Sequence, residues 1–193
     1  MRAILISIKP KWVAKILNGE KTIEIRKTMP KCDLPIDVYI YCTKEESLIY
    51  TDGTDWKGDY VDYKYYADYK GMEDDIGSGK VVAKFTLNKV EHFEYDTCSR
   101  DISGYWLDNG EVFKNKGTCL KSEELFNYIK SGDGYAWHID KLEIFDKPKE
   151  LSEFKKCQLL WNCDPHDCKT CRHSLSLTKA PQSWCYVEVN END

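Results

Sequence analysis

The residues best suited to chemistry lie near the N-terminus, in the segment NGEKTIEIRK that spans positions 18–27. Lys21 offers a mobile cation there, and Arg26 offers a planar fork that fits a phosphate or a carboxylate. Glu24 can accept an N–H from a nucleobase or act as a general base. Together the three side chains predict either a binding site for a nucleotide or RNA, or a hydrolytic site with Lys21, Glu24 and Arg26 as catalytic residues.

The spacing of these residues indicates a β-strand, because apolar and polar side chains alternate with a period of two. Ile23 and Ile25 point to one side, and the other side carries Thr22, Glu24 and Arg26. A solvated sheet surface is the alternative interpretation, in which an exposed Glu–Arg pair contributes only about 0.2–1 kcal/mol. Strict alternation puts Lys21 on the isoleucine side, so it joins the polar group only because it stands at the mouth of the strand. We expect this polar face to line a cleft, with Thr22 as a ligand contact.

The segments before and after this strand predict the elements that position it. Residues 4–8 (ILISI) form a candidate buried strand, and PKWVAKIL at positions 10–17 has the apolar spacing of a helix that ends at Gly19. Further strands are expected in DVYIYCT, KVVAKFTLNKVEHF, GYAWHIDKLEIFD and PQSWCYVEV. A short helix is expected with Ser122 as its N-cap and Leu125, Phe126 and Ile129 facing inward, and a helical turn in KPKELSEF. This pattern favours an α+β domain with a small, mostly antiparallel β-barrel and flanking helices.

Composition narrows the class of protein. The chain has 193 residues, of which 41% are hydrophobic, enough for one ordinary core. The opening residues are too short and too polar for a signal peptide, and no apolar run is long enough to span a membrane. We therefore expect a cytoplasmic protein without a membrane partner. Its nine cysteines are then expected to be reduced thiols or metal ligands.

Charge is unevenly distributed along the chain. The net charge is −5, yet residues 1–31 carry eight basic and two acidic side chains, whereas residues 45–79 carry ten acidic and three basic ones. One face can thus be basic enough for a nucleic acid despite the acidic average. The Tyr- and Asp-rich stretch at about 45–79 shows no sustained period, and we interpret it as a long insertion or flexible arm.

At GEKTIEIR, positions 19–26, the chain resembles the G-x-K-x-x-E-x-R signature of the ASCH family, which has a PUA-like β-barrel fold. The opening ILISIKPKW, the strand DVYIYCT, the segment YAWHIDKLEIFDKPKELSEF and the closing PQSWCYVEV are similar to the phage and bacterial members. The resemblance implies one ASCH domain over residues 1–193, with insertions at about 45–79 and about 157–173. It also implies recognition of RNA or of a modified nucleotide.

The resemblance extends to two hydrolytic branches of that family. One branch hydrolyses N4-acetylcytidine as an amidohydrolase, with a catalytic lysine at the position of Lys21 and a threonine at the position of Glu24. Glutamate cannot replace a threonine hydroxyl, so this chain departs from that branch. Another branch is linked to RNA cleavage. Binding and hydrolysis therefore both stay open.

Two residues of the strand GYAWHID are further candidates for ligand contacts. Trp137 could stack on a base, which is worth about 1–3 kcal/mol per base. A core position is the alternative interpretation for this tryptophan. His138 alternates with Ile139 and is a candidate acid or base.

A cysteine cluster marks the C-terminal third of the chain. Cys157, Cys163, Cys168 and Cys171 fall within fifteen residues, and the spacing Cys168-x-x-Cys171 is typical of a zinc knuckle. We expect a structural zinc ion bound by these four residues, with His166 or His173 as substitutes for Cys163. Reduced cysteines without metal are the alternative.

Overall fold

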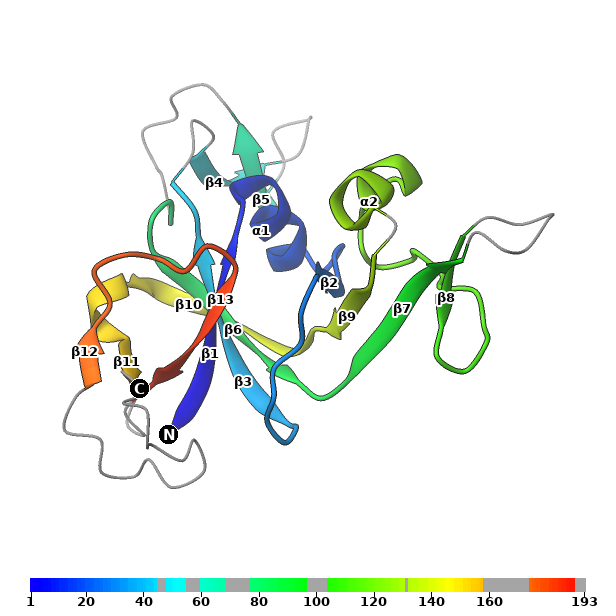
Figure 1. The fold of residues 1–193 in the computed structure, drawn as a ribbon. Coiled ribbons are helices and arrows are strands. Elements are labelled where there is room, and N and C mark those ends of the chain that lie inside the picture. Colours follow the sequence, from blue (N-terminus) through cyan, green and yellow to red (C-terminus); the bar gives the residue numbers. More distant parts are fainter. Residues whose placement is uncertain are drawn as a thin grey trace.

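The structure is a computed structural model, and it describes residues 1–44, 48–54, 60–68, 77–96, 104–130, 132–157 and 174–189. Within these ranges the strands gather into three sheets (Figure 1). The largest sheet has the order β10–β6–β3–β1–β13–β11–β12. Its strands are β1 (Arg2–Ile8), β3 (Ile36–Cys42), β6 (Val81–Leu87), β10 (Asp140–Lys149), β11 (Lys155–Cys157), β12 (Ser174–Ser176) and β13 (Trp184–Glu188). β1 and β3 are parallel, and the other neighbours are antiparallel.

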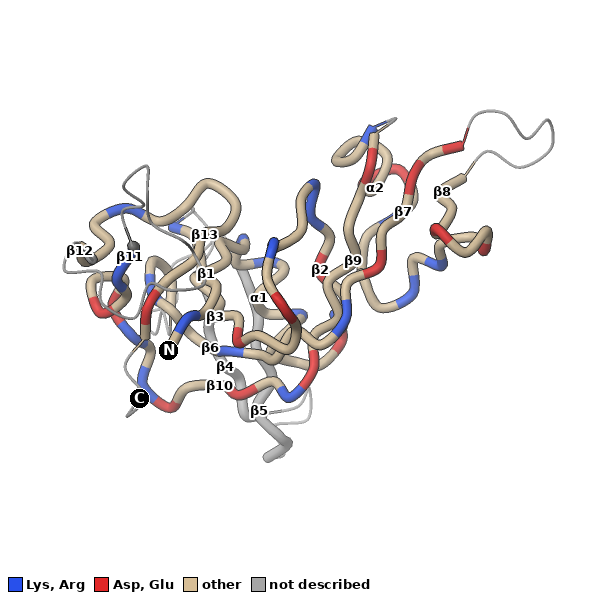
Figure 2. The backbone as a smooth tube through the Cα atoms, turned by 60° about the horizontal axis from the view of Figure 1, so that its bottom comes forward, with Lys and Arg blue, Asp and Glu red and all other residues tan. Residues whose placement is uncertain are grey.

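The second sheet carries the polar strand predicted from the sequence. Its order is β2–β9–β7–β8, and all its pairs are antiparallel. The strands are β2 (Ile23–Arg26), β7 (Val90–Asp96), β8 (Gly104–Leu107) and β9 (Gly134–His138). β2 lies between the helices α1 (Pro10–Leu17) and α2 (Ser122–Ile129) in both views (Figures 1 and 2). The predicted α+β class with mostly antiparallel sheets is confirmed.

The acidic stretch at 45–79 contains regular structure that the sequence did not reveal. β4 (Leu48–Thr54) and β5 (Tyr60–Asp68) pair as an antiparallel ladder, and β5 lies against α1. The sequence did not predict these two strands, and the interpretation of the stretch as a long insertion stays a prediction. Clustered aspartates and glycines are rare in strands, so local propensity concealed the ladder.

Some boundaries also differ from the prediction. KVVAKFTLNKVEHF is two strands, β6 and β7, and GYAWHIDKLEIFD is likewise divided into β9 and β10. The helical turn in KPKELSEF is the 3₁₀ turn Leu151–Glu153. Ser122 is the first residue of α2 and not its N-cap; the cap is Lys121, whose N–H donates to Glu124 Oε2 at 2.8 Å. Phe126, expected to face inward, is 44% exposed.

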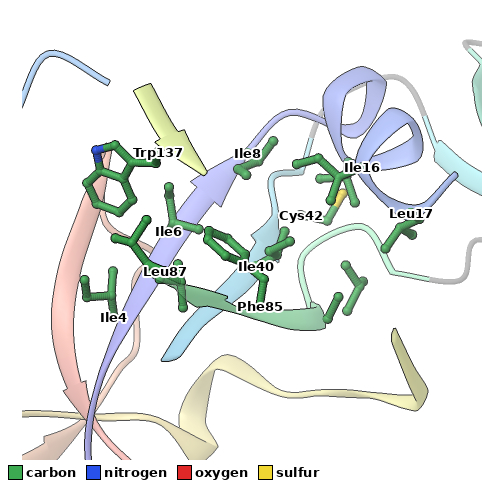
Figure 3. Close-up of a cluster of buried hydrophobic side chains, with 14 of the residues drawn as sticks. Ile4, Ile6, Ile8, Ile16, Leu17, Ile40, Cys42, Phe85, Leu87 and Trp137 are labelled. Atoms are coloured by element: carbon green, nitrogen blue, oxygen red, sulfur yellow. The ribbon is translucent and has the colours of Figure 1, made fainter. Parts of the chain in front are cut away.

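The main core lies beside the large sheet. Ile4 and Ile6 of β1, Ile40 of β3 and Phe85 of β6 are buried together with apolar residues of α1 (Figure 3). Burying each such side chain stabilises the fold by about 1.5–3 kcal/mol. A second cluster joins β2 to β7, β8, β9 and α2; its buried members are Ile25, Phe93, Tyr105, Phe113, Leu125, Ile129 and Ala136. The main core contains the apolar residues at the end of α1, and the second cluster contains the apolar side of β2.

Within the described part of the chain, no helix is long and apolar enough to cross a membrane.

Candidate functional site

The polar strand begins where the chain turns back from α1. The main-chain N–H of Lys21 donates to the carbonyl of Lys15 at 3.0 Å, which fixes its backbone against the helix. The N–H groups of Thr22 and Ile23 then donate to the carbonyl of Gly117, at 2.8 and 3.0 Å. The entry to β2 is therefore set by α1 and by a loop almost a hundred residues further along the chain.

Pairing with β9 decides which way the side chains of β2 point. Glu24 is opposite Trp137 and Arg26 is opposite Tyr135, so these four residues share one face of the ladder. Ile25 is opposite Ala136 and lies in the second apolar cluster. The predicted alternation is confirmed, and the polar face is turned inward: Glu24 is 8% exposed and Arg26 6%.

Glu24 stands between two cations. Its Oε2 lies 3.2 Å from Lys21 Nζ, and its Oε1 lies 2.9 Å from an Nη of Arg26. We call Lys21, Glu24 and Arg26 the ion triad. All three side chains are buried, so the structure brings together the three residues that the sequence singled out.

Lys21 is held by three acceptors. Besides Glu24, its ammonium donates to the carbonyls of Ile23 and Thr118, at 2.8 and 2.7 Å. An ammonium has three hydrogens to donate, so each one has a protein partner. Lys21 is only 3% exposed. Its role in this arrangement is to fix the carboxylate of Glu24 and to add positive charge to the site.

Arg26 connects the triad to the large sheet. One Nη donates to the carbonyl of Ser7 at 2.8 Å as well as contacting Glu24, and the other donates to Ser183 Oγ at 3.2 Å. The Nε is buried and has no hydrogen-bond partner among the described residues. Ser7 is itself held by β13, because its N–H donates to the carbonyl of Ser183 at 2.9 Å. The end of β1 and the start of β13 thus form a cradle for the guanidinium.

The charges of the triad do not cancel, because two cations share one carboxylate. Burying charge costs several kcal/mol per ion, and pairing recovers that cost only when the geometry and the remaining hydrogen bonds are good. Such a network is weak evidence for stability. Basic and acidic positions both occur along α1 and around β2 (Figure 2). The triad itself, with two cations and one carboxylate, has an excess of positive charge despite the acidic chain.

Three partly exposed aromatic side chains surround the triad. Lys21 Nζ lies 5.5 Å from the ring centroid of Trp12 on α1. Trp184, next to Ser183, donates its Nε1–H to Thr28 Oγ1 at 3.0 Å. Tyr128 on α2 is 39% exposed. Burial raises the pKa of Tyr128, while Arg26 lowers it and Glu24 raises it. The Nζ of Lys27, the residue directly after Arg26, lies 5.2 Å from the centroid of the Tyr128 ring.

The predicted ligand-contact residues are dispersed. Thr22 is exposed at the entry to β2. Trp137 lies beside Glu24 in the ladder, but it is 0% exposed and belongs to the main core (Figure 3). Its ring packs against Trp184 with centroids 5.6 Å apart. His138 pairs with Ile23, on the face opposite the triad, and its Nε2 lies 2.5 Å from Glu91 Oε2.

Sequence reasoning missed the groups that complete the site: Ser7, Thr118, Tyr128 and Ser183. Two of them, Ser7 and Thr118, act through backbone carbonyls, which any residue type supplies, so no sequence signal could have found them. Ser183 lies in the closing segment PQSWCYVEV, which the sequence predicted to be a strand. Tyr128 lies on the exposed face of α2, and the sequence pattern predicted only the apolar face of that helix.

The predicted zinc ligands are mostly beyond what the structure describes. Cys163, Cys168 and Cys171, with the substitutes His166 and His173, lie outside the described residues. The main chain of Cys157 is described, in β11, where it pairs with Ser174 of β12. The two strands that flank residues 158–173 are thus antiparallel neighbours.

Comparison with known proteins supports the fold. No family model matches the chain, and no curated protein matches it. Two crystal structures of the ASCH protein ZmASCH from Zymomonas mobilis, a tyrosine-to-phenylalanine mutant and a serine-to-alanine mutant, are similar to it with TM-scores of 0.52 and 0.53. The chain has an ASCH fold. Sequence identity to both structures is 15%; 96% of this chain is covered, with 90% and 88% of theirs. At this identity the likeness concerns the ASCH fold and not the activity.

Proposed function

We propose that the chain binds RNA or a modified nucleotide at the ion triad. The observation that carries this function is the convergence of Lys21, Glu24 and Arg26 in one buried network with a surplus positive charge. The triad carries one more positive than negative charge, and such an excess attracts an anionic ligand. The ASCH fold agrees with this proposal, since the resemblance at positions 19–26 implies the same class of ligand.

Within this function Glu24 recognises the base by accepting a hydrogen bond from it. Each oxygen of a carboxylate accepts about two hydrogen bonds. Oε1 has its charged partner in Arg26 and Oε2 in Lys21, so each oxygen retains capacity for one more donor. A glutamate is the usual acceptor for the exocyclic amino group of cytosine. We accordingly assign Glu24 to an N–H of the bound base, held in place by the two cations.

The phosphate of the ligand is assigned to exposed lysines near the triad. Lys21 and the Nη groups of Arg26 already donate to protein acceptors. Lys11 on α1 and Lys27 directly after β2 are exposed, with ammonium groups close to the rings of Trp12 and Tyr128. Binding through such surface cations weakens as salt rises, because bound counterions are released.

Hydrolysis of RNA or of a modified nucleoside is the second candidate, and the orientation of Glu24 favours it. A carboxylate fixed by two charged partners is preorganised to move a proton, and the adjacent cations would stabilise negative charge in a transition state. In this function Lys21 and Arg26 are electrostatic groups. Incubation of the protein with single-stranded RNA and with N4-acetylcytidine, followed by chromatography of the products, tests the hydrolase directly.

Binding is tested by titrating a panel of nucleosides, nucleotides and single-stranded RNA at low salt. We expect wild-type protein to bind RNA or at least one nucleotide, and Glu24→Gln to weaken ligands that offer an exocyclic amino group more than those that do not. Glu20→Gln is the matched control, because Glu20 forms an exposed pair with Lys15. No binding by wild-type protein to any member of the panel would overturn the proposed function.

A structural zinc ion at Cys157, Cys163, Cys168 and Cys171 is also proposed. The cysteine spacing supports it. So does the pairing of Cys157 with Ser174, which holds the two ends of the cysteine-rich segment side by side. Four protein ligands would leave no open coordination position, so this metal would stabilise the chain and take no part in catalysis.

A further inference from the structure

Each of the two helices beside β2 carries an aromatic ring that lies near a lysine of the segment 21–27. Trp12 on α1 has Lys21 Nζ 5.5 Å from its ring centroid. On α2, the ring of Tyr128 has the Nζ of Lys27, the residue directly after Arg26, 5.2 Å from its centroid. Its neighbour Ile129 is buried, whereas Tyr128 is 39% exposed. Both rings therefore lie close to the segment that carries the ion triad, and each has part of its surface in water.

The helices that carry these rings are joined across the site. Lys11 Nζ of α1 lies 3.5 Å from Glu124 Oε1 of α2. Both partners are substantially exposed, so the pair contributes little to stability. β2 lies between α1 and α2 in two different views (Figures 1 and 2). The position of the two helices on either side of β2 thus follows from the fold and not from one contact.

The ammonium group of an exposed lysine lies over each ring. Lys11 Nζ lies 4.4 Å from the centroid of Trp12, and Lys27 Nζ lies 5.2 Å from that of Tyr128. Both lysines are exposed. The site therefore combines flat π faces with cations that lie over them on long, exposed side chains. A nucleotide has the matching chemistry, since its base is planar and its phosphate is anionic.

We propose that Trp12 and Tyr128 clamp the base of a nucleotide unit of single-stranded RNA, with Lys11 and Lys27 on its phosphates. The clamp rests on the proposed function and assigns the stacking role to these two rings, in place of the buried Trp137. The base lies above the ion triad, where its edge reaches the carboxylate of Glu24. The exposed parts of the two rings are then the surfaces that the ligand covers.

The test uses an RNA octamer of alternating cytidine and 2-aminopurine, because the fluorescence of 2-aminopurine is quenched when it stacks on an aromatic ring. We expect wild-type protein to quench the fluorescence on binding. Tyr128→Leu removes one ring of the clamp and should weaken the affinity about 5- to 150-fold, the equivalent of about 1–3 kcal/mol per stacked base. It should also reduce the quenching. Tyr128→Phe keeps the ring and should bind like wild type.

Phe126→Leu is the matched control, because Phe126 lies on the same helix with similar exposure but packs against Tyr95, with centroids 5.5 Å apart. It should leave affinity and quenching unchanged. Wild-type binding with equal affinity and quenching in Tyr128→Leu and Phe126→Leu would overturn the clamp and leave the proposed function intact. Absence of binding by wild-type protein would overturn both. An equal response to the DNA octamer of the same sequence would overturn the restriction to RNA.

Discussion

The ammonium of Lys21 donates to the carbonyl of Thr118 at 2.7 Å, across a separation of 97 residues. The contact is buried, and it joins the start of the polar strand to the loop before α2. Thr118 is fully buried, and Leu120 N–H donates to its hydroxyl at 3.1 Å. The position of Lys21 therefore depends on a loop that no property of the polar strand reveals.

Gly117→Ala is expected to disturb this loop and the site with it. Gly117 has a φ of +88°, which costs a residue with a Cβ about 1–2 kcal/mol. An added Cβ would also meet Thr22 Oγ1 at 2.5 Å. The control is Gly110→Ala, where φ is +80° but nothing lies within 4 Å, so only the backbone cost applies. Urea unfolding measures both; equal losses of stability would show that contact with Thr22 is unimportant.

Glu24→Ala is expected to destabilise the protein far more than a comparable surface change. Removal of the carboxylate leaves Lys21 and Arg26 buried without their counter-charge, and breaking a buried pair in this way typically costs about 3–5 kcal/mol. Glu20→Ala removes an exposed pair with Lys15, at 3.0 Å, and should cost about 1 kcal/mol or less. The free energy of unfolding from chemical denaturation checks both values. Similar losses in the two variants would contradict the buried network.

The sequence predicted the local features of this site and not its long-range ones. The helix at 10–17 and the alternation of Ile23, Glu24, Ile25 and Arg26 follow from periodicity, which acts within a few residues. The inward orientation of the polar face depends on which sheets pack on each side of β2. That information is spread over β9, α1 and α2, and the resemblance at positions 19–26 was the only local sign of it.

The errors have a related cause. Trp137 was a candidate for stacking on a base, with a core position as the alternative, and the structure places its ring in the core. Tyr128 could not be selected from the sequence, because a tyrosine on the polar side of a short helix is ordinary. β4 and β5 were missed because their pairing overrides poor strand propensity.

The pair between Glu91 and His138 predicts a loss of stability in acid. Burial raises the pKa of Glu91, but hydrogen bonds and charge from Lys89 and His138 outweigh it, so the pKa lies below the ordinary 4.5. A carboxyl with a lowered pKa binds fewer protons when folded than when unfolded. Its stabilising contribution is therefore present above about pH 4.5 and disappears as the pH falls through the lowered value.

Glu91→Gln tests this relationship. The variant should be less stable than wild type near neutral pH, and the difference should shrink as the pH is lowered below 4.5. Denaturation curves over that range give the measurement. Glu94→Gln is a suitable control, because Glu94 lies on the same strand and is exposed. A constant difference between wild type and Glu91→Gln at all pH values would contradict a lowered pKa.

The proposed zinc ion predicts metal content and metal-dependent stability. Purified protein should contain close to one zinc per chain by atomic spectroscopy, and a strong chelator should lower its melting temperature, because metal bound only to the folded state stabilises that state. Cys168→Ser with Cys171→Ser should abolish the zinc content. Cys42→Ser is unsuitable as a control, since Cys42 is fully buried in the core. Cys32→Ser is suitable, because Cys32 is partly exposed in the loop after β2 and remote in sequence from the cluster. The Cys32→Ser variant should retain the metal. If wild-type protein lacks zinc and its melting temperature is unchanged by the chelator, the cysteine spacing has no metal-binding role.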